Sequence, residues 1–186
     1  MTALAPFITV EDLAAAVPGL TGEQAEWLCD WASAAVRADV VQQVNLVADE
    51  ITLDGSGSDV LLLPELEVHQ VGKVRLDGDL LVEGRHYSWS SAGVLWRLAS
   101  RWHRPIWPRR PRCITVAYRH GWDEGSPQFQ AARQVALEVA ARTSRNPDML
   151  QSERIGDWSR AFVPTGGRAQ LTDIERTLLD PLRRER

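Results

Sequence analysis

The stretch VRLDGDLLV at residues 74–82 decides the fold of the middle of the chain. Its Asp77-Gly78 pair stands between two short apolar runs, which is a strong signal of a β-hairpin with a two-residue turn. Outward from this hairpin, short apolar runs bounded by turn residues predict more strands, at residues 50–53, 60–63, 86–90, 94–98 and 113–119. We therefore expect residues 47–123 to form an antiparallel β-sheet or a small β-sandwich.

Helix signals precede this β region. Thr9 with Asp12 begins a short helix over residues 10–17, and Thr21 with Gln24 is a capping-box pattern that begins a longer helix ending near residue 44. The polar face predicted for the longer helix consists of Glu23, Glu26, Asp30, Ser33 and Arg37. Its other side is apolar, so this helix needs a packing partner.

Two more helices are predicted after the β region. Ser126-Pro127 opens a helix to about residue 142, because proline is well accepted at the first helical position. Residues 144–171 are rich in Gly, Pro and Ser and are expected to be irregular. Thr172 with Glu175 then begins a final helix with an apolar stripe, and Pro181 predicts a kink or an end near residue 180. The stripe residues are Ile174, Leu178 and Leu182.

The predicted fold class is therefore α+β. A small helical bundle of two N-terminal helices, one central helix and one C-terminal helix is formed by residues 1–46 and 124–186, with an irregular arm at 144–171. The β region, residues 47–123, is inserted into this bundle as a second domain. A length of 186 residues fits this organisation.

Charge is unevenly distributed along the chain. The whole protein has 25 acids, 21 bases and a net charge of −4. Residues 1–67 hold 12 acids and one base, a charge of −11, whereas residues 68–186 hold 13 acids and 20 bases, a charge of +7. This division excludes a generally basic nucleic-acid binder and indicates an acidic end and a basic end.

Targeting signals and membrane spans are not expected. No apolar stretch approaches the roughly 20 residues that cross a bilayer. The N-terminus has no signal-peptide pattern, and two cysteines make no disulfide framework, so we expect an intracellular compartment.

The sequence gives little support to an enzyme. His69, His86, His103 and His120 lack the close Cys or carboxylate spacing of a metal site, and His120 with Asp123 is better interpreted as a loop histidine than as half of one. The G-x-G fragment at 55–58 is followed neither by Lys-Ser/Thr nor by a helix. We expect no catalytic residues, cofactor or metal ion.

Residues 97–119 form the most unusual segment, with seven arginines, His103, two tryptophans, three prolines and no acid. Arginines interleaved with indoles suit stacking and phosphate contacts with nucleic acid. They equally suit a loop that docks on an acidic protein surface. The candidate interface or channel residues are Trp102, Arg104, Trp107, Arg109, Arg110 and Arg112.

We favour the protein contact, because the acidic N-terminal part of the same chain supplies a matching surface on a second copy. A contact between two different patches closes into a ring or grows into a filament. The alternative stays open as a nucleic-acid-binding module that uses the Arg/Trp-rich loop 97–119.

Several short motifs carry a family resemblance. They are VAYRHGW at 116–122, the helix start Ser126-Pro127, SERIGDWS at 152–159, and LTDIE at 171–175 followed by Leu178-Leu179. In this order they resemble head-to-tail adaptor proteins of tailed bacteriophages, whose signature S-E-x-I-G-D-Y-S has an aromatic residue, often Tyr, where this chain has Trp158. The β insertion is found in some branches of that family and is absent from others.

The resemblance implies a structural role in the neck of a virion, after assembly in the host cytoplasm. Such adaptors form a twelve-fold homo-oligomeric ring beneath the portal protein, extend its channel, and dock the next connector, stopper or tail protein. Genomic DNA passes through the channel without sequence-specific binding, and no membrane is involved.

The resemblance also implies roles for two groups of residues. An arm that crosses subunit boundaries, or alternatively covers the protein's own core, includes Glu153, Ile155, Gly156, Asp157 and Trp158. The closing helix, which reaches the portal or ends as a solvated basic tail, includes Leu171, Thr172, Glu175, Leu178, Leu179, Arg183 and Arg184.

Overall fold

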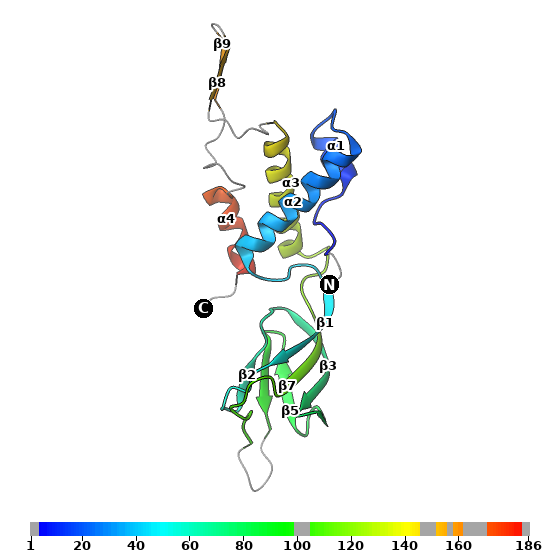
Figure 1. The fold of residues 1–186 in the computed structure, drawn as a ribbon, viewed down its shortest axis with the longest axis vertical. Helices are drawn as coiled ribbons and strands as arrows, with labels where there is room; N and C mark the ends of the chain where they lie inside the picture. The colour runs from blue at the N-terminus through cyan, green and yellow to red at the C-terminus, as the bar shows by residue number, and fades with distance from the viewer. Residues whose placement is uncertain (1–3, 99–104, 146–151, 156–157, 162–170, 184–186) are drawn as a thin grey trace. The chain divides into compact units, whose positions relative to one another are not determined.

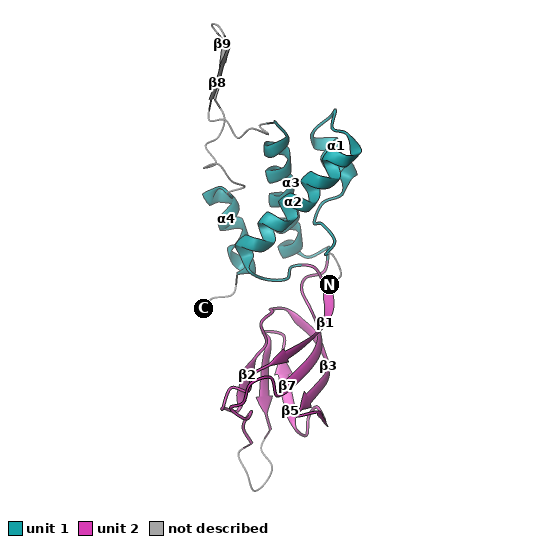
Figure 2. Cartoon of the chain, in the orientation of Figure 1, with its two compact units in different colours: residues 1–44, 124–186 teal, residues 45–123 magenta. Residues whose placement is uncertain are grey.

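The computed structural model describes residues 4–98, 105–145, 152–155, 158–161 and 171–183, with the backbone alone for residues 152–155 and 158–161. The chain divides into two compact units, a helical unit of residues 1–44 with 124–186 and a β unit of residues 45–123 (Figure 2). Helices lie in one unit and two antiparallel sheets in the other (Figure 1), which confirms the predicted α+β class.

The helical unit contains α1 (Val10–Ala16), α2 (Gly22–Val40), α3 (Pro127–Arg145), α4 (Asp173–Leu179) and a final 3₁₀ turn, η1 (Asp180–Leu182). All three predicted N-terminal caps are present as complete capping boxes, in which Thr9, Thr21 and Thr172 exchange hydrogen bonds with the residue three positions later. The final helix ends at Leu179, as Pro181 predicts.

The predicted end of α2 near residue 44 is wrong. Val41 adopts a left-handed conformation with φ of 55°, and its N–H donates to the carbonyl of Arg37. A residue in this conformation ends a helix, so the chain leaves α2 four residues earlier than the sequence predicts. Val44 is then buried outside the helix.

Ser33 corrects the predicted polar face of α2, because it is fully buried. Its hydroxyl donates to the carbonyl of Cys29 at 2.7 Å and accepts from the N–H of Phe7 at 2.9 Å. Phe7 in turn packs edge-on against Phe129 of α3, with ring centroids 5.7 Å apart. The small serine side chain thus joins the N-terminal segment to α2 and α3 without an unsatisfied polar group.

The buried face of α3 explains how the helices approach one another. It is formed by Phe129, Ala132, Val135, Ala136, Val139 and Ala140. Half of these side chains are alanine, and α3 packs against α1, α2 and α4. Because alanine side chains are small, α3 can lie close to these helices.

The predicted stripe of α4 is wrong in two of its three members. Ile174 is 76% exposed and Leu178 is 41% exposed, whereas Leu182 is buried. The buried side of this segment consists instead of Leu171, Glu175, Leu179 and Leu182. Glu175 is the charged member of this set, and it is buried because it has hydrogen-bond partners there, as described below.

The segment 144–171 also differs from the irregular structure expected. Strands β8 (Ser152–Ile155) and β9 (Trp158–Ala161) pair antiparallel, with Ser152 opposite Ala161 and Ile155 opposite Trp158. A two-residue connection that contains glycine is a hairpin signal, and here Gly-Asp at 156–157 separates the strands.

The described residues of the β unit form seven strands in two antiparallel sheets, one in the order β1-β7-β3-β4 and one in the order β2-β6-β5. The strands are β1 (Val47–Leu53), β2 (Val60–Leu62), β3 (Val68–Leu76), β4 (Asp79–Leu81), β5 (Tyr87–Ser90), β6 (Val94–Arg97) and β7 (Ile114–His120). The hairpin predicted at residues 74–82 joins β3 to β4. Asp77 and Gly78 have φ of 51° and 91°, as a tight turn of this type requires.

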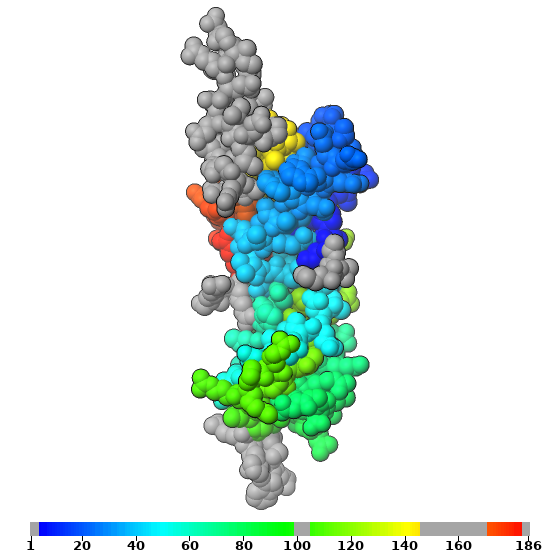
Figure 3. Space-filling view, in the orientation of Figure 1, coloured from blue at the N-terminus to red at the C-terminus, as the bar shows by residue number. Residues whose placement is uncertain are grey.

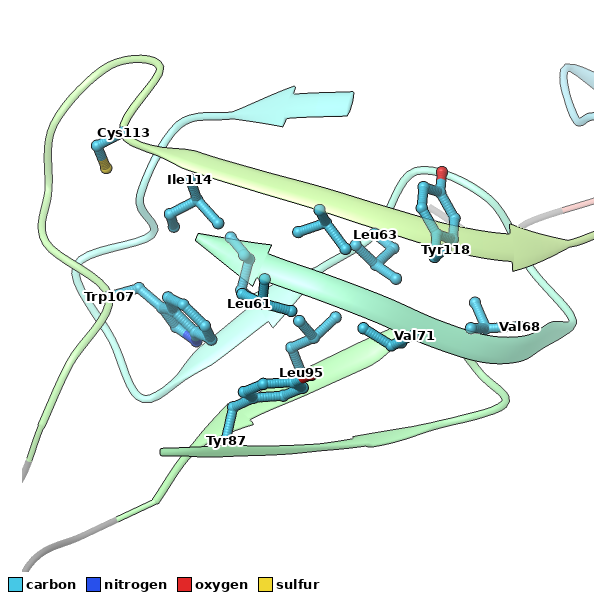
Figure 4. Packing of buried hydrophobic residues seen from close by; sticks show 12 residues of the cluster. Leu61, Leu63, Val68, Val71, Tyr87, Leu95, Trp107, Cys113, Ile114 and Tyr118 are labelled. Carbon is cyan, nitrogen blue, oxygen red and sulfur yellow. The ribbon is translucent and has the colours of Figure 1, made fainter. Parts of the chain in front are cut away.

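One hydrophobic core serves both sheets of the β unit (Figure 4). Val71, Val74 and Ile114 come from the larger sheet, and Leu61 and Leu95 from the smaller one. Trp107 joins them from the loop before β7. The arginine-rich segment is therefore attached to the core of the β unit.

Candidate interaction surface

The loop before β7 is held against the turn at residues 54–58. The N–H of Trp107 donates to the carbonyl of Ser58 at 2.7 Å, and the N–H of Gly57 donates to the carbonyl of Trp107 at 2.9 Å. The N–H of Gly55 donates to the carbonyl of Arg110 at 2.9 Å. Three backbone hydrogen bonds between the same two segments fix the conformation of this loop.

Trp107 anchors the loop and is not available to a partner. Its side chain is fully buried, and the Arg97 guanidinium lies 5.2 Å from the centroid of its ring. This corrects the prediction that Trp107 is an exposed interface or stacking residue. Burial of the large indole in the β core stabilises the folded protein more than exposure of the ring to water would. Trp102 and Arg104 lie outside the described residues.

The G-x-G pattern in the turn at 54–58 has a structural role, because it allows the turn to pack against the loop before β7. A Cβ added to Gly55 would lie 1.6 Å from the carbonyl oxygen of Pro108, so only glycine fits there. The neighbouring Asp54 accepts the N–H of Arg112 at 2.7 Å. The residues that position the arginines therefore lie about 50 residues upstream in sequence, a pairing that spacing alone does not reveal.

The arginines of this loop divide into two kinds. Arg110 forms an ion pair with Asp77 of the β3–β4 turn. Arg109 and Arg112 are exposed, and in the described part of the chain neither guanidinium has an ion-pair partner. Ile106, on the same loop, is also exposed. We call Ile106, Arg109 and Arg112 the arginine platform.

The predicted arm residues are described only in part. Glu153 lies opposite Arg160, and Ile155 lies opposite Trp158, in the β8–β9 ladder. Gly156 and Asp157 lie outside the described residues. The motif of the arm therefore forms a hairpin at the level of the backbone.

Glu175 connects α4 to α3 inside one subunit. Its carboxylate accepts two hydrogen bonds from Arg142, at 2.7 and 3.2 Å, and one from the N–H of Thr172 at 2.6 Å. Burial alone would raise the pKa of Glu175, but the hydrogen bonds from Arg142 and Thr172 outweigh it and lower the pKa below 4.5. Leu171 and Leu179 are buried on either side, while Leu178 is partly exposed.

Arg183 is not part of a solvated basic tail. Its guanidinium pairs with Asp39 of α2 and with Asp180, the latter at 2.9 Å. Arg176 lies 3.5 Å from the same Asp39 carboxylate. These contacts fasten α4 to α2, and Arg184 lies outside the described residues.

His120 corrects another expectation, because it is a core residue at the end of β7 and not a loop histidine. Its ring stacks on Tyr118 with centroids 4.5 Å apart, and its Nε2 lies 3.4 Å from the Asp49 carboxylate. Burial lowers the pKa of His120, and the attraction of Glu65 and Asp49 for a proton offsets this only in part.

Among the described residues, no group of three or more His, Cys, Asp or Glu side chains is arranged to hold a metal ion. Within the same residues, no helix is both long enough and apolar enough to cross a membrane.

Comparison with known proteins gives structural neighbours but no sequence family. No family model and no curated protein matches the chain. Chains in three solved structures share its fold at 16% identity. One is from the neck of an empty gene transfer agent (GTA) particle computed with C6 symmetry, with a TM-score of 0.56 over 96% of this chain and 90% of that chain.

The second is from the neck of a native GTA particle computed with C12 symmetry, with a TM-score of 0.53 over 100% of this chain and 97% of that one. The third is from the virion of a native GTA particle, with a TM-score of 0.57 over 96% and 90%. Because these matches span nearly the whole length of each chain, the protein shares a fold, with both of its units, with chains of GTA particles.

Proposed function

We propose that the protein is a structural, non-enzymatic component of a virion neck, a head-to-tail adaptor that forms a ring below the portal. In that position it extends the DNA channel and docks the next connector or tail protein. The observation that carries this proposal is the fold shared over at least 96% of the chain with chains from GTA particles, two of them from the neck. The motifs at 152–159 and 171–175 support the same role.

A homo-oligomeric ring is the active form in this proposal. The neck structures that contain the neighbours have C6 or C12 symmetry, which supports a ring, and the family resemblance favours twelve subunits. The partners are copies of this chain, the portal protein and the next neck protein. DNA passes through the channel without contacts that read its sequence.

Assembly is the mechanism, so the described residues contribute as fixed surfaces. The ion pairs of α4 with α2 and α3 make the helical unit a preformed block. Ile174 and Leu178 on α4 are left exposed and are available to a neighbouring protein. The β8–β9 arm supplies the subunit-crossing segment in this proposal.

A nucleic-acid-binding module remains the second candidate, and the exposed Arg109 and Arg112 are the observation in its favour. The burial of Trp107 removes one of the two indoles on which that interpretation rested. We therefore rank it below the adaptor.

The test is deletion of the gene from the particle-producing genome, with complementation by the intact gene as the control. We expect DNA-filled heads and free tails that do not join, visible by electron microscopy, and joining restored by complementation. Joined particles in the deletion strain would contradict the proposal. Tight DNA binding by an isolated monomer that never associates with portal rings would favour the second candidate.

A further inference from the structure

The outward surface of α2 combines acids with two stacked indoles. Residues 23, 26, 27, 30 and 31 follow the spacing of three and four that places side chains on one side of a helix. Trp27 is 58% exposed, and its ring stacks on the half-buried Trp31 with centroids 5.8 Å apart and planes 20° from parallel. We call Glu23, Glu26, Trp27, Asp30 and Trp31 the α2 face. Part of α2 lies at the surface of the helical unit (Figure 3).

The α2 face is suited to a cation. Its three carboxylates are exposed, and none of them forms an ion pair within the described part of the chain. The faces of indole rings are negative and attract guanidinium groups, most strongly when water is displaced. Carboxylates beside such rings supply hydrogen-bond acceptors for the same guanidinium.

Several acids elsewhere in the helical unit already have ion-pair partners inside the subunit, unlike the three carboxylates of the α2 face. Asp12 pairs with Arg133 at 2.7 Å, Glu175 with Arg142 at 2.7 Å, and Asp39 with Arg176 and Arg183. The carboxylates of the α2 face are not neutralised in this way and remain available to another molecule.

The matching cations are those of the arginine platform. Arg109 and Arg112 lie three residues apart on a loop held by backbone hydrogen bonds, so a partner need not order it on binding. We propose that the α2 face of one subunit binds the arginine platform of a second copy, with Arg109 and Arg112 against the indoles and carboxylates. A contact between two different patches of the same chain is heterologous and can close a ring. The inference rests on the proposed ring and names the surfaces that join neighbours.

Charge exchange between the two surfaces tests this contact. Glu26→Arg with Asp30→Arg reverses one surface, and Arg109→Glu with Arg112→Glu reverses the other. We expect each double variant to reduce the yield of joined particles at least about ten-fold, and the four changes together to restore most of it. Exposed charges reversed elsewhere, Glu138→Arg on α3 and Arg85→Glu in the β unit, are the matched controls and should leave the yield unchanged.

Covalent trapping reports the contact directly. A full chain with Glu26→Cys and Arg109→Cys, oxidised in purified particles, should give a ladder of disulfide-linked copies, since Cys29 and Cys113 are buried. The pair Glu138→Cys with Arg109→Cys is the control. Circular dichroism checks that each variant is folded.

The outcomes separate this inference from the proposed function. Normal particle yield in both charge-reversal variants, or a ladder no stronger than the control, overturns the contact while the adaptor role stands. If deletion of the gene leaves heads and tails joined, the adaptor role fails. The same cross-linking of the concentrated full chain in solution then decides the contact, and the absence of a ladder overturns it.

Discussion

At the scale of single residues, Gly55 holds the arginine platform in place. The backbone of the 54–58 turn approaches the loop so closely that any side chain at position 55 would overlap the Pro108 carbonyl. We expect Gly55→Ala to displace the loop and to destabilise the β unit by about 1–3 kcal/mol, the usual cost of overpacking. Urea unfolding followed by tryptophan fluorescence measures this, because Trp107 is in the β core.

Gly22→Ala is the matched control for that change. Gly22 is in the first turn of α2, with no atom within 4 Å of an added Cβ and no left-handed backbone angle. Alanine there should leave stability unchanged or raise it slightly. Equal losses for the two variants would show that the close approach at Gly55 has no energetic importance.

His120 makes the stability of the β unit depend on pH. Its folded pKa is lowered below 6.5 by burial, so in acid the unfolded chain takes up a proton that the folded chain does not. The free energy of unfolding should therefore have its full value above about pH 6.5. Below that pH it should fall by at most about 1.4 kcal/mol per pH unit. His120→Phe keeps a ring against Tyr118 and removes the titration. Unfolding between about pH 7.5 and pH 5.5 should show a smaller slope in the variant, and identical slopes would contradict this account.

The position of Trp107 illustrates what a sequence does not reveal at this scale. Pro105, Pro108 and Pro111 interrupt any regular period, so no pattern of two or 3.6 residues indicates which side chain of the loop faces inward. Composition alone favoured exposure, because arginines surround the indole. The fixed contact with the 54–58 turn, distant in sequence, decided otherwise.

At the scale of elements, the Arg142–Glu175 pair determines how α4 packs on α3. Arg142→Met would leave the buried Glu175 carboxylate with only its Thr172 amide partner. We expect a loss of about 2–3 kcal/mol, below the range for a fully buried pair because the Arg142 side chain is 26% exposed. Thermal unfolding of this variant, of Glu175→Gln and of the double variant measures the loss.

Glu175→Gln provides the complementary variant. Added to Arg142→Met, it removes the uncompensated charge and should recover part of the lost stability, a coupling that two independent sites would not show. This non-additivity between the two substitutions should shrink below about pH 4.5, because protonation of Glu175 removes the same charge that Glu175→Gln removes.

Local patterns predicted the start and the end of α4 better than its buried face. The capping box at Thr172 and the stop at Pro181 depend on neighbouring residues alone, and both are present. The predicted stripe of α4 was wrong because it was drawn from apolar residues alone, whereas the buried side includes Glu175. Only the partner on α3, 33 residues away, allows Glu175 to be buried.

At the scale of the whole molecule, the structure changes the interpretation of the uneven charge along the chain. The sequence predicted that the acidic and basic ends meet between subunits. Within the helical unit they meet inside one subunit, since Asp12 pairs with Arg133 across 121 positions and Asp39 with Arg183 across 144. The contact that we propose between subunits is smaller and better defined, the α2 face with the arginine platform.

The two units are expected to fold independently. Asn45 and Trp122 form a bridge where the β unit begins and ends, and Gly121 allows this approach because a Cβ there would lie 2.2 Å from the Asn45 carbonyl oxygen. The chain therefore enters and leaves the β unit at one place. A variant that lacks residues 45–123, with Val44 joined to Glu124 by a short Gly/Ser linker, should keep α1 to α4 and unfold cooperatively, as circular dichroism would show.

Independence also has a quantitative consequence. The Asp12–Arg133 and Arg142–Glu175 ion pairs both join residues of the helical unit. Arg142→Met should therefore cost the shortened chain the same free energy of unfolding as it costs the full chain, within about 0.5 kcal/mol. A larger difference, or a shortened chain that fails to unfold cooperatively, would show that the helical unit depends on the β unit for its packing. Equal costs would mean that the β unit is an insertion that presents the arginine platform without supporting the helices.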